Sequence, residues 1–109
     1  MAAAEVPGII MRVHRVRTEV VLAACDEELL ERQLPVGGAG RTVTVSRHFY
    51  GERRVRKEEL LLALKRATIA NLLGTRVCEL ATEEGLLPAG STGTLGGVPH
   101  AEIICMPDP

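Results

Sequence analysis

Aromatic residues are nearly absent from this chain of 109 residues, which contains one Phe, one Tyr and no Trp. The core must therefore be built from Leu, Val, Ile and Ala, and few large rings remain to line an apolar binding pocket. Long hydrophobic runs are absent too. The longest are Val20–Cys25 and Leu60–Leu64, far shorter than the roughly 20 residues that a transmembrane helix needs. Met1–Glu5 has neither the basic nor the apolar region of a signal peptide. We therefore expect a cytoplasmic protein with no membrane segment.

Cysteine is scarce and shows no pairing pattern. Cys25, Cys78 and Cys105 are odd in number and far apart, which fits neither a disulfide framework nor a zinc ribbon. The glycine-rich stretch 37–40 is followed by no Lys-Ser/Thr pair, so it does not read as a phosphate-binding loop. The sequence predicts reduced, buried thiols, and it gives no sign of a metal site or another cofactor.

The length of the chain favours one domain, because chains of this size can bury roughly 65% of their unfolded surface. The sequence contains no internal repeat and no linker. We expect a single domain over residues 1–109, with residues 1–7 flexible and 107–109 forming a short tail.

The N-terminal half alternates apolar and polar residues, as half-buried strands do. The segments Ile9–His14 and Glu19–Cys25 predict an antiparallel hairpin. Asp26 is typical of a helix N-cap and predicts a short helix that ends near Leu34. Residues 41–46 alternate again and predict a third strand.

The C-terminal half carries the helical periodicity. The longest helix is expected from Glu58, and its continuation through residues 69–72 stays open. Thr75 suits the cap of a second helix, which Gly85 would close. Residues 89–97 are typical of a loop, and 101–106 predict a final strand. The fold class is α+β: an N-terminal β-hairpin, a short helix, a third strand, two consecutive helices and a C-terminal strand, giving a small, mostly antiparallel sheet with helices on one face.

Four stretches, in their order and spacing, resemble an archaeal family called domain of unknown function 424. They are Cys25–Leu30, Phe49–Gly51, Ala67–Gly74 and Gly96–Ala101, within a resemblance that spans about residues 9–105. It implies an archaeal, cytoplasmic, single-domain protein with a link to the translation apparatus through gene neighbourhood. It brings no activity and no site residue to this chain. The arginine-rich stretch 53–57 departs from the family pattern.

Charge is concentrated in the middle of the chain. Residues 41–66 carry eight basic and three acidic side chains, a net charge of +5, whereas the whole chain carries −1. Basic side chains beside a stacking ring are what single-stranded nucleic acid requires. The leading hypothesis is therefore a noncatalytic module that binds RNA or a translation factor through Tyr50, Arg53, Arg54, Arg56 and Lys57. The alternative is that this stretch is only a solvated approach to a helix.

A second hypothesis is a small enzyme or ligand-binding protein with a site near Cys25, Asn71 and His100. Asn71 is the only Asn, and it lies in an apolar stretch, where it could form the polar floor of a groove shared with His100. Cys25 precedes a predicted helix N-terminus, but the three acids that follow it oppose thiolate formation. Because no partner base is identifiable, the sequence predicts no catalytic residue and favours a protein that is not an enzyme.

A third hypothesis is a structural homodimer. The predicted long helix has a leucine-rich face formed by Leu60, Leu61 and Leu64. If that face were exposed, a second copy could cover it.

Overall fold

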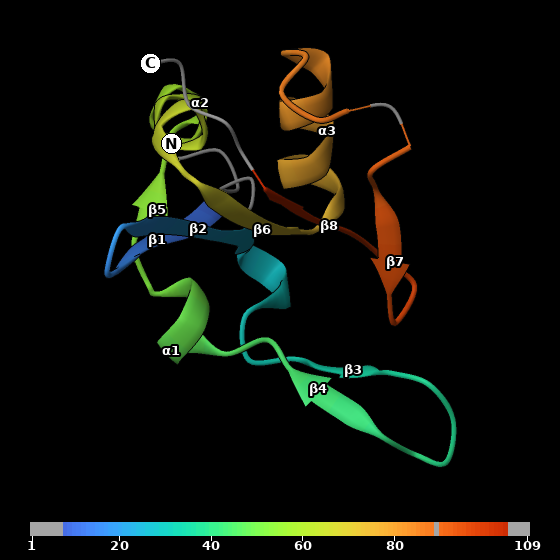
Figure 1. The fold of residues 1–109 in the computed structure, drawn as a ribbon. Helices are drawn as coiled ribbons and strands as arrows, with labels where there is room; N and C mark the ends of the chain where they lie inside the picture. The colour runs from blue at the N-terminus through green and yellow to red at the C-terminus, as the bar shows by residue number, and fades with distance from the viewer. Residues whose placement is uncertain (1–7, 89, 105–109) are drawn as a thin grey trace, which may run out of the picture.

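The protein has a mixed α+β fold, in which a large, mostly antiparallel sheet is combined with helices; the computed structural model describes residues 8–88 and 90–104 (Figure 1). The sheet has six strands in the order β5-β1-β2-β6-β8-β7, and a separate two-stranded sheet joins β3 to β4. The strands are β1 (Ile9–Val16), β2 (Glu19–Asp26), β3 (Gln33–Pro35), β4 (Thr42–Thr44), β5 (Arg54–Val55), β6 (Ile69–Leu73), β7 (Gly93–Leu95) and β8 (Val98–Ile104). The helices of the described residues are α1 (Arg47–Tyr50), α2 (Lys57–Arg66), α3 (Thr75–Glu83) and the 3-10 turn η1 (Glu27–Leu29).

The predicted hairpin is present as β1 and β2. These strands pair in antiparallel register from Ile9 with Asp26 to Val16 with Glu19. The connecting turn is tight, and Arg17 takes a positive φ of 56° there. The period-two pattern of the sequence therefore produces the element that it predicts.

The chain between α2 and α3 is a strand, so the two helices are not consecutive as predicted, and the helix does not continue through residues 69–72. β6 pairs in parallel with β2 and antiparallel with β8. It begins where the Thr68 hydroxyl accepts a hydrogen bond from the Val20 backbone N–H at 2.8 Å. Both neighbours of β6 are distant in sequence, so pairing partners rather than local propensity decide its conformation.

The short helix expected after Asp26 is wrong in its extent. Only the 3-10 turn η1 forms, and the chain then enters β3. Asp26 does not cap this turn. Its buried carboxylate instead accepts hydrogen bonds from the backbone N–H groups of Arg76 at 3.0 Å and Val77 at 2.9 Å, and so caps α3. The predicted third strand forms as β4, but it pairs with β3 and not within the large sheet.

Both faces of the large sheet are covered, which corrects the prediction of helices on one face. Leu60 and Leu64 of α2 pack with Leu22 and Leu72 on one face. Tyr50 of α1 packs with Leu34 of β3 and with Val45, which follows β4, on the other face. Figure 1 shows α2 and α3 on one side of the sheet and α1 with the β3–β4 arm on the opposite side.

The chain ends differ from the prediction in detail. Part of the expected loop 89–97 forms β7, and β8 starts at Val98, three residues before the predicted strand. The expected flexible segment 1–7, the tail 107–109 and the end of the predicted strand lie outside the described residues. Among the residues that are described, no helix is both long enough and apolar enough to cross a membrane.

Candidate ligand-binding pocket

A pocket of about 450 Å³ lies between the large sheet and the segment that contains β4 and α1. We call it the central pocket. Aliphatic side chains and Phe49 supply most of its wall, and a few polar groups gather on the sheet side. The lining residues are Val36, Val43, Thr44, Val45, Ser46, Phe49, Tyr50, Asn71, Leu73, Leu95, His100 and Glu102. An apolar hollow with a few convergent polar groups is the usual composition of a small-molecule site.

Three of the polar residues that line the central pocket form one hydrogen-bonded chain. The Tyr50 hydroxyl donates to Asn71 Oδ1 at 2.6 Å, and Asn71 Nδ2 donates to Glu102 Oε1 at 3.2 Å. His100 Nε2 lies 3.6 Å from the same Glu102 oxygen. An ionised carboxylate can only accept, so the amide nitrogen of Asn71 must face Glu102 and its oxygen must face Tyr50. Three elements, α1, β6 and β8, thus hold a defined polar wall.

The side chains of a strand point alternately to its two faces, and this alternation places the residues of the polar wall on one face of the sheet. Asn71 and Leu73 alternate with Ala70 and Leu72, which face the other core. In the antiparallel register of β6 and β8, Asn71 is opposite Glu102. One strand pairing therefore sets the contact between two residues that are 31 positions apart in the sequence.

Helix α1 positions Tyr50 in the wall of the central pocket. Ser46 caps this one-turn helix, because its hydroxyl oxygen accepts from the backbone N–H of His48 at 3.0 Å and of Phe49 at 3.4 Å. Phe49 stacks on His14 with a centroid distance of 5.3 Å and meets Tyr50 edge to face at 4.9 Å. The two aromatic residues of the chain thus anchor α1 against the sheet.

The turn between β7 and β8 forms the end of the pocket near Leu95. Gly96 and Gly97 both have positive φ, of 59° and 81°. A Cβ atom at Gly96 would lie 2.8 Å from the carbonyl oxygen of Pro35, so only glycine permits this approach of the turn to β3. The glycine pair noted in the sequence therefore has a structural reason, and His100 follows it on the pocket side of β8.

The structure brings together two of the three residues of the sequence-derived ligand site. Asn71 and His100 both line the central pocket, whereas Cys25 does not. Cys25 is completely buried beneath it, and burial, with the nearby Asp26 and Glu28 carboxylates, raises the pKa of the thiol to about 12. Cys25 therefore remains a protonated packing residue and cannot serve as a nucleophile at neutral pH.

Tyr50 is not the surface ring that the nucleic-acid hypothesis needs. It is only 6% exposed, and its hydroxyl is committed to Asn71. Burial, followed by the effects of Cys25 and Glu102, raises its pKa above the usual value for a tyrosine. A ring packed in a core cannot stack on a base, so its assignment to an RNA-binding surface is wrong.

The arginines of the same hypothesis are exposed, but carboxylates accompany them. Arg53 forms an ion pair with Glu59, and Arg54 lies 3.3 Å from Glu27. Arg56 precedes α2, and its backbone N–H donates to the Glu59 carboxylate at 3.3 Å. Lys57 is exposed in the first turn of α2. The acidic partners reduce the positive potential that the sequence count suggests.

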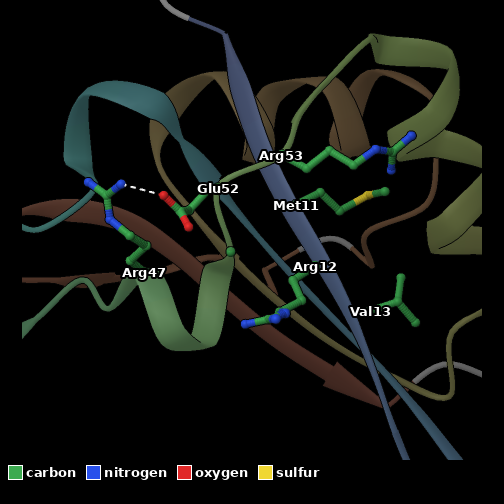
Figure 2. Close-up of a pocket in the computed structure, with 7 residues that line it drawn as sticks. Met11, Arg12, Val13, Arg47, Glu52 and Arg53 are labelled. Atoms are coloured by element: carbon green, nitrogen blue, oxygen red, sulfur yellow. Dashed lines mark hydrogen bonds and ion pairs between the residues drawn. The ribbon is translucent and has the colours of Figure 1, made fainter.

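A second hollow, which we call the arginine hollow, lies beside β1 and holds three arginines from different segments (Figure 2). Arg12 donates to the His48 carbonyl at 2.8 Å, whereas Arg47 is paired with Glu31 at 3.2 Å and Glu52 at 2.6 Å. Figure 2 shows that the guanidinium groups of Arg12, Arg47 and Arg53 point in different directions. They do not converge on one anion.

Sequence reasoning missed Glu102, which belongs to the polar wall. Its only local signal is the position two residues after His100, which places both side chains on one face of a strand. Its partner Asn71 becomes apparent only when β6 pairs with β8. Among the described residues, no group of three His, Cys, Asp or Glu side chains could hold a metal ion.

Most of the leucine face of the homodimer hypothesis is covered within the chain, whereas Leu61 is half-buried. Leu60 is completely buried and Leu64 is 3% exposed, both in the core under α2. The exposed leucine of this helix is Leu62, at 51%. A second copy therefore has no surface formed by Leu60 and Leu64 to cover.

Comparison with known proteins identifies the family. The sequence pattern of the family described as "Protein of unknown function (DUF424)" matches residues 14–106, and the chain belongs to this family. The chain matches none of the curated proteins with which it was compared. It is similar to the crystal structure of an uncharacterized conserved protein from Methanopyrus kandleri, with 29% identity and a TM-score of 0.77. That similarity covers 93% of this chain and 94% of the other.

Proposed function

We propose that the protein is a noncatalytic binding protein that holds a small ligand in the central pocket. The observation that carries this proposal is the hydrogen-bonded chain Tyr50–Asn71–Glu102 on one wall of an otherwise apolar hollow of about 450 Å³. Tyr50 is buried, and the two hydrogen bonds fix the half-buried Asn71 and the exposed Glu102 relative to it. Side chains joined in this way form a preorganised wall. Such a wall can recognise a ligand without moving.

The chemistry of the wall indicates the class of ligand. The Glu102 carboxylate accepts hydrogen bonds. The Tyr50 hydroxyl donates its hydrogen bond to Asn71, and its oxygen keeps lone pairs that can accept one from a ligand. No Lys or Arg occurs among the residues that line the central pocket. The pocket therefore suits an apolar or aromatic body that carries a hydrogen-bond donor or a positive charge, and it disfavours phosphates and carboxylates.

The pocket gives no support to catalysis by a covalent route. The nearest thiol, Cys25, is buried and protonated. The Tyr50 hydroxyl has a raised pKa and donates to an amide, so it does not supply a phenolate base. Binding without chemistry is the function that these groups support.

Phenethylamine is a suitable probe, and phenylacetate is its anionic counterpart. We expect phenethylamine, with a dissociation constant of about 1 mM, to shift the backbone amide resonances of Asn71, His100 and Glu102 in a two-dimensional NMR titration. Phenylacetate should leave them unchanged. No shift with phenethylamine, or equal shifts with both probes, would contradict the proposal.

Two charge variants provide the matched comparison. Glu102→Gln keeps an oxygen that can accept from Asn71 but removes the charge, and it should weaken phenethylamine binding about tenfold. Glu83→Gln removes one charge from the exposed end of α3 and should leave binding unchanged. Equal effects of both variants would show that the probe senses only the net charge.

Binding to RNA or to a translation factor stays a prediction from the sequence. Labelled single-stranded RNA, titrated at low and high salt against the protein and an Arg53→Ala/Arg54→Ala variant, tests it. The prediction requires binding that weakens with salt and with the two substitutions.

A further inference from the structure

We propose that the outer edge of β1 is a docking site for an extended acidic peptide segment, which would add to the large sheet as a strand antiparallel to β1. This site is separate from the central pocket. The proposal depends on the unpaired backbone of β1, on an apolar groove beside it and on the charge of the surrounding side chains.

The unpaired backbone lies beyond the short strand β5. β5 pairs with β1 only at Ile9 and Ile10, and the Met11 N–H then donates to the Arg53 carbonyl at 3.1 Å. In an antiparallel pair, alternate residues direct their N–H and C=O groups to the same edge. Val13 and Arg15 therefore present four backbone groups to this edge, and no described residue bonds to them. An open edge of this kind is a template for another strand.

An apolar groove of about 540 Å³ runs beside the same edge, between β1 and α2. Its lining includes Met11, Val13 and Leu62. Val13 is 40% exposed and Leu62 is 51% exposed, so apolar surface is accessible next to the free backbone groups. The arginine hollow adjoins this groove, because Met11 and Val13 line both. Figure 2 shows Met11 and Val13 on one side of β1 and Arg12 on the opposite side.

Charge decides between a second copy and a different partner. β1 contains Arg12, His14 and Arg15 but no acid. The rim of the groove adds Arg66, and neither it nor Arg15 has an ion-pair partner within 8–88 and 90–104. The one acid that lines the groove, Glu59, is already paired with Arg53. Pairing β1 with β1 of another copy would place basic residues opposite basic residues, which is unfavourable. An acidic strand has the complementary charge.

The geometry also fixes which peptide side chains face which hollow. Peptide residues opposite Val13 and Arg15 would exchange backbone hydrogen bonds with them, and their side chains would enter the groove. The alternate residues would direct their side chains toward Arg12. The matching segment therefore alternates apolar and acidic residues, with the backbone bonds made by the apolar ones.

The acetylated pentapeptide Glu-Val-Glu-Val-Glu amide is the probe, and its fluorescein-labelled form can be titrated by anisotropy. Its Lys-Val-Lys-Val-Lys analogue should bind about tenfold more weakly or not at all. N-methylation of the two valines removes the donors that face β1 and should weaken binding about tenfold. N-methylation of two glutamates places the methyl groups on the solvent edge and should change it less than about twofold. Equal effects of the two methylation patterns would overturn strand addition.

Variants of the protein locate the site. Arg12→Gln keeps a donor for the His48 carbonyl but loses the charge opposite the peptide acids, and it should weaken binding about fivefold. Arg41→Gln removes the same charge from an exposed position far from β1 and should have no effect. Leu62→Glu should abolish binding by placing an acid in the groove. Equal effects of Arg12→Gln and Arg41→Gln would overturn the proposal.

Two further outcomes assign the edge to another occupant and would also overturn the proposal. One is a homodimer in sedimentation equilibrium that Leu62→Glu converts to a monomer. The other is displacement of the peptide by oligouridylate with a loss of RNA binding in Arg12→Gln, which would make the edge a nucleic-acid site.

Discussion

Asp26 is the residue whose removal should show most clearly how the fold is held together. It is 3% exposed, and its two carboxylate oxygens accept from the Val77 N–H at 2.9 Å and the Arg76 N–H at 3.0 Å. Asp26→Ala would leave both donors at the start of α3 without a partner. It would also remove a negative charge from the positive end of the helix dipole.

The magnitude follows from these two bonds. A hydrogen bond to a charged group contributes about 1.5–3 kcal/mol, and loss of an N-cap costs about 1 kcal/mol. Because the two bonds share one carboxylate and constitute the cap, they are not additive, and we expect Asp26→Ala to lower the free energy of unfolding by about 3 kcal/mol. For a chain of this size, this is a fall in Tm of about 12 °C.

Urea denaturation monitored by circular dichroism provides the measurement, with Glu28→Ala as the matched control. Glu28 also carries one negative charge and also contacts Arg76, at 3.1 Å and 3.3 Å, but it is exposed. Its loss should cost less than about 1 kcal/mol, as for other surface ion pairs. If Asp26→Ala destabilises the protein no more than Glu28→Ala, the carboxylate does not cap α3 as described. Asp26→Asn, which retains one acceptor oxygen, should fall between the two.

Three other changes test the packing around the two cores. Gly74→Ala should destabilise the protein by about 3 kcal/mol in the same assay, because the residue has a φ of 123° and a Cβ atom would clash with the Asp26 carboxylate. Gly37→Ala is the control: Gly37 also has a positive φ but lies in open space, so the substitution should cost only about 1 kcal/mol. Tyr50→Phe should cost about 1–2 kcal/mol, because it leaves the amide oxygen on β6 without its donor, and a neutral result would show that water replaces the hydroxyl. Burial raises the pKa of Cys25 to about 12 and of Cys78 to about 11, above the range of about 8.5–9 expected for unfolded thiols. Both thiols therefore stay protonated in the folded chain while they ionise in the unfolded chain, so the free energy of unfolding should decline as the pH rises from about 9 to about 11. Replacement of both cysteines by Ala should flatten this decline. An unchanged slope would contradict the burial of the two thiols.

Much of the fold could be predicted where the signal is local. The hairpin of β1 and β2 and the helices α2 and α3 follow from periodicity within one segment, which is why the α+β class is clear from the residues alone. β5 and β7 are two and three residues long, too short to show a period. The 3-10 turn after Asp26 also could not be predicted. Aspartate is a typical N-cap residue for a helix that follows it directly, but Asp26 bonds to a helix 50 residues further along the chain.

In the candidate site, too, local signals could be predicted and contacts between distant segments could not. Asn71 and His100 could be singled out because each is a rare polar residue beside apolar or glycine-rich sequence, and the structure places both in one pocket. Whether Cys25 belongs to the ligand site and whether Tyr50 lies on the surface could not be judged from the sequence. Both depend on which face of the sheet the β3–β4 arm covers. A count of charged residues likewise cannot show that Arg53 lies beside Glu59.

The sequence by itself determined the family, the α+β class, the aliphatic core and the scarcity of aromatic residues and cysteine, since these depend on composition and on patterns within short segments. The tertiary structure alone decided that Glu102 meets Asn71, that the basic stretch is accompanied by acids, and that β1 has an open edge beside an apolar groove. The physical reason is that strand pairing joins residues far apart in the chain. Its register is set by the burial of two faces at once, which no single segment specifies.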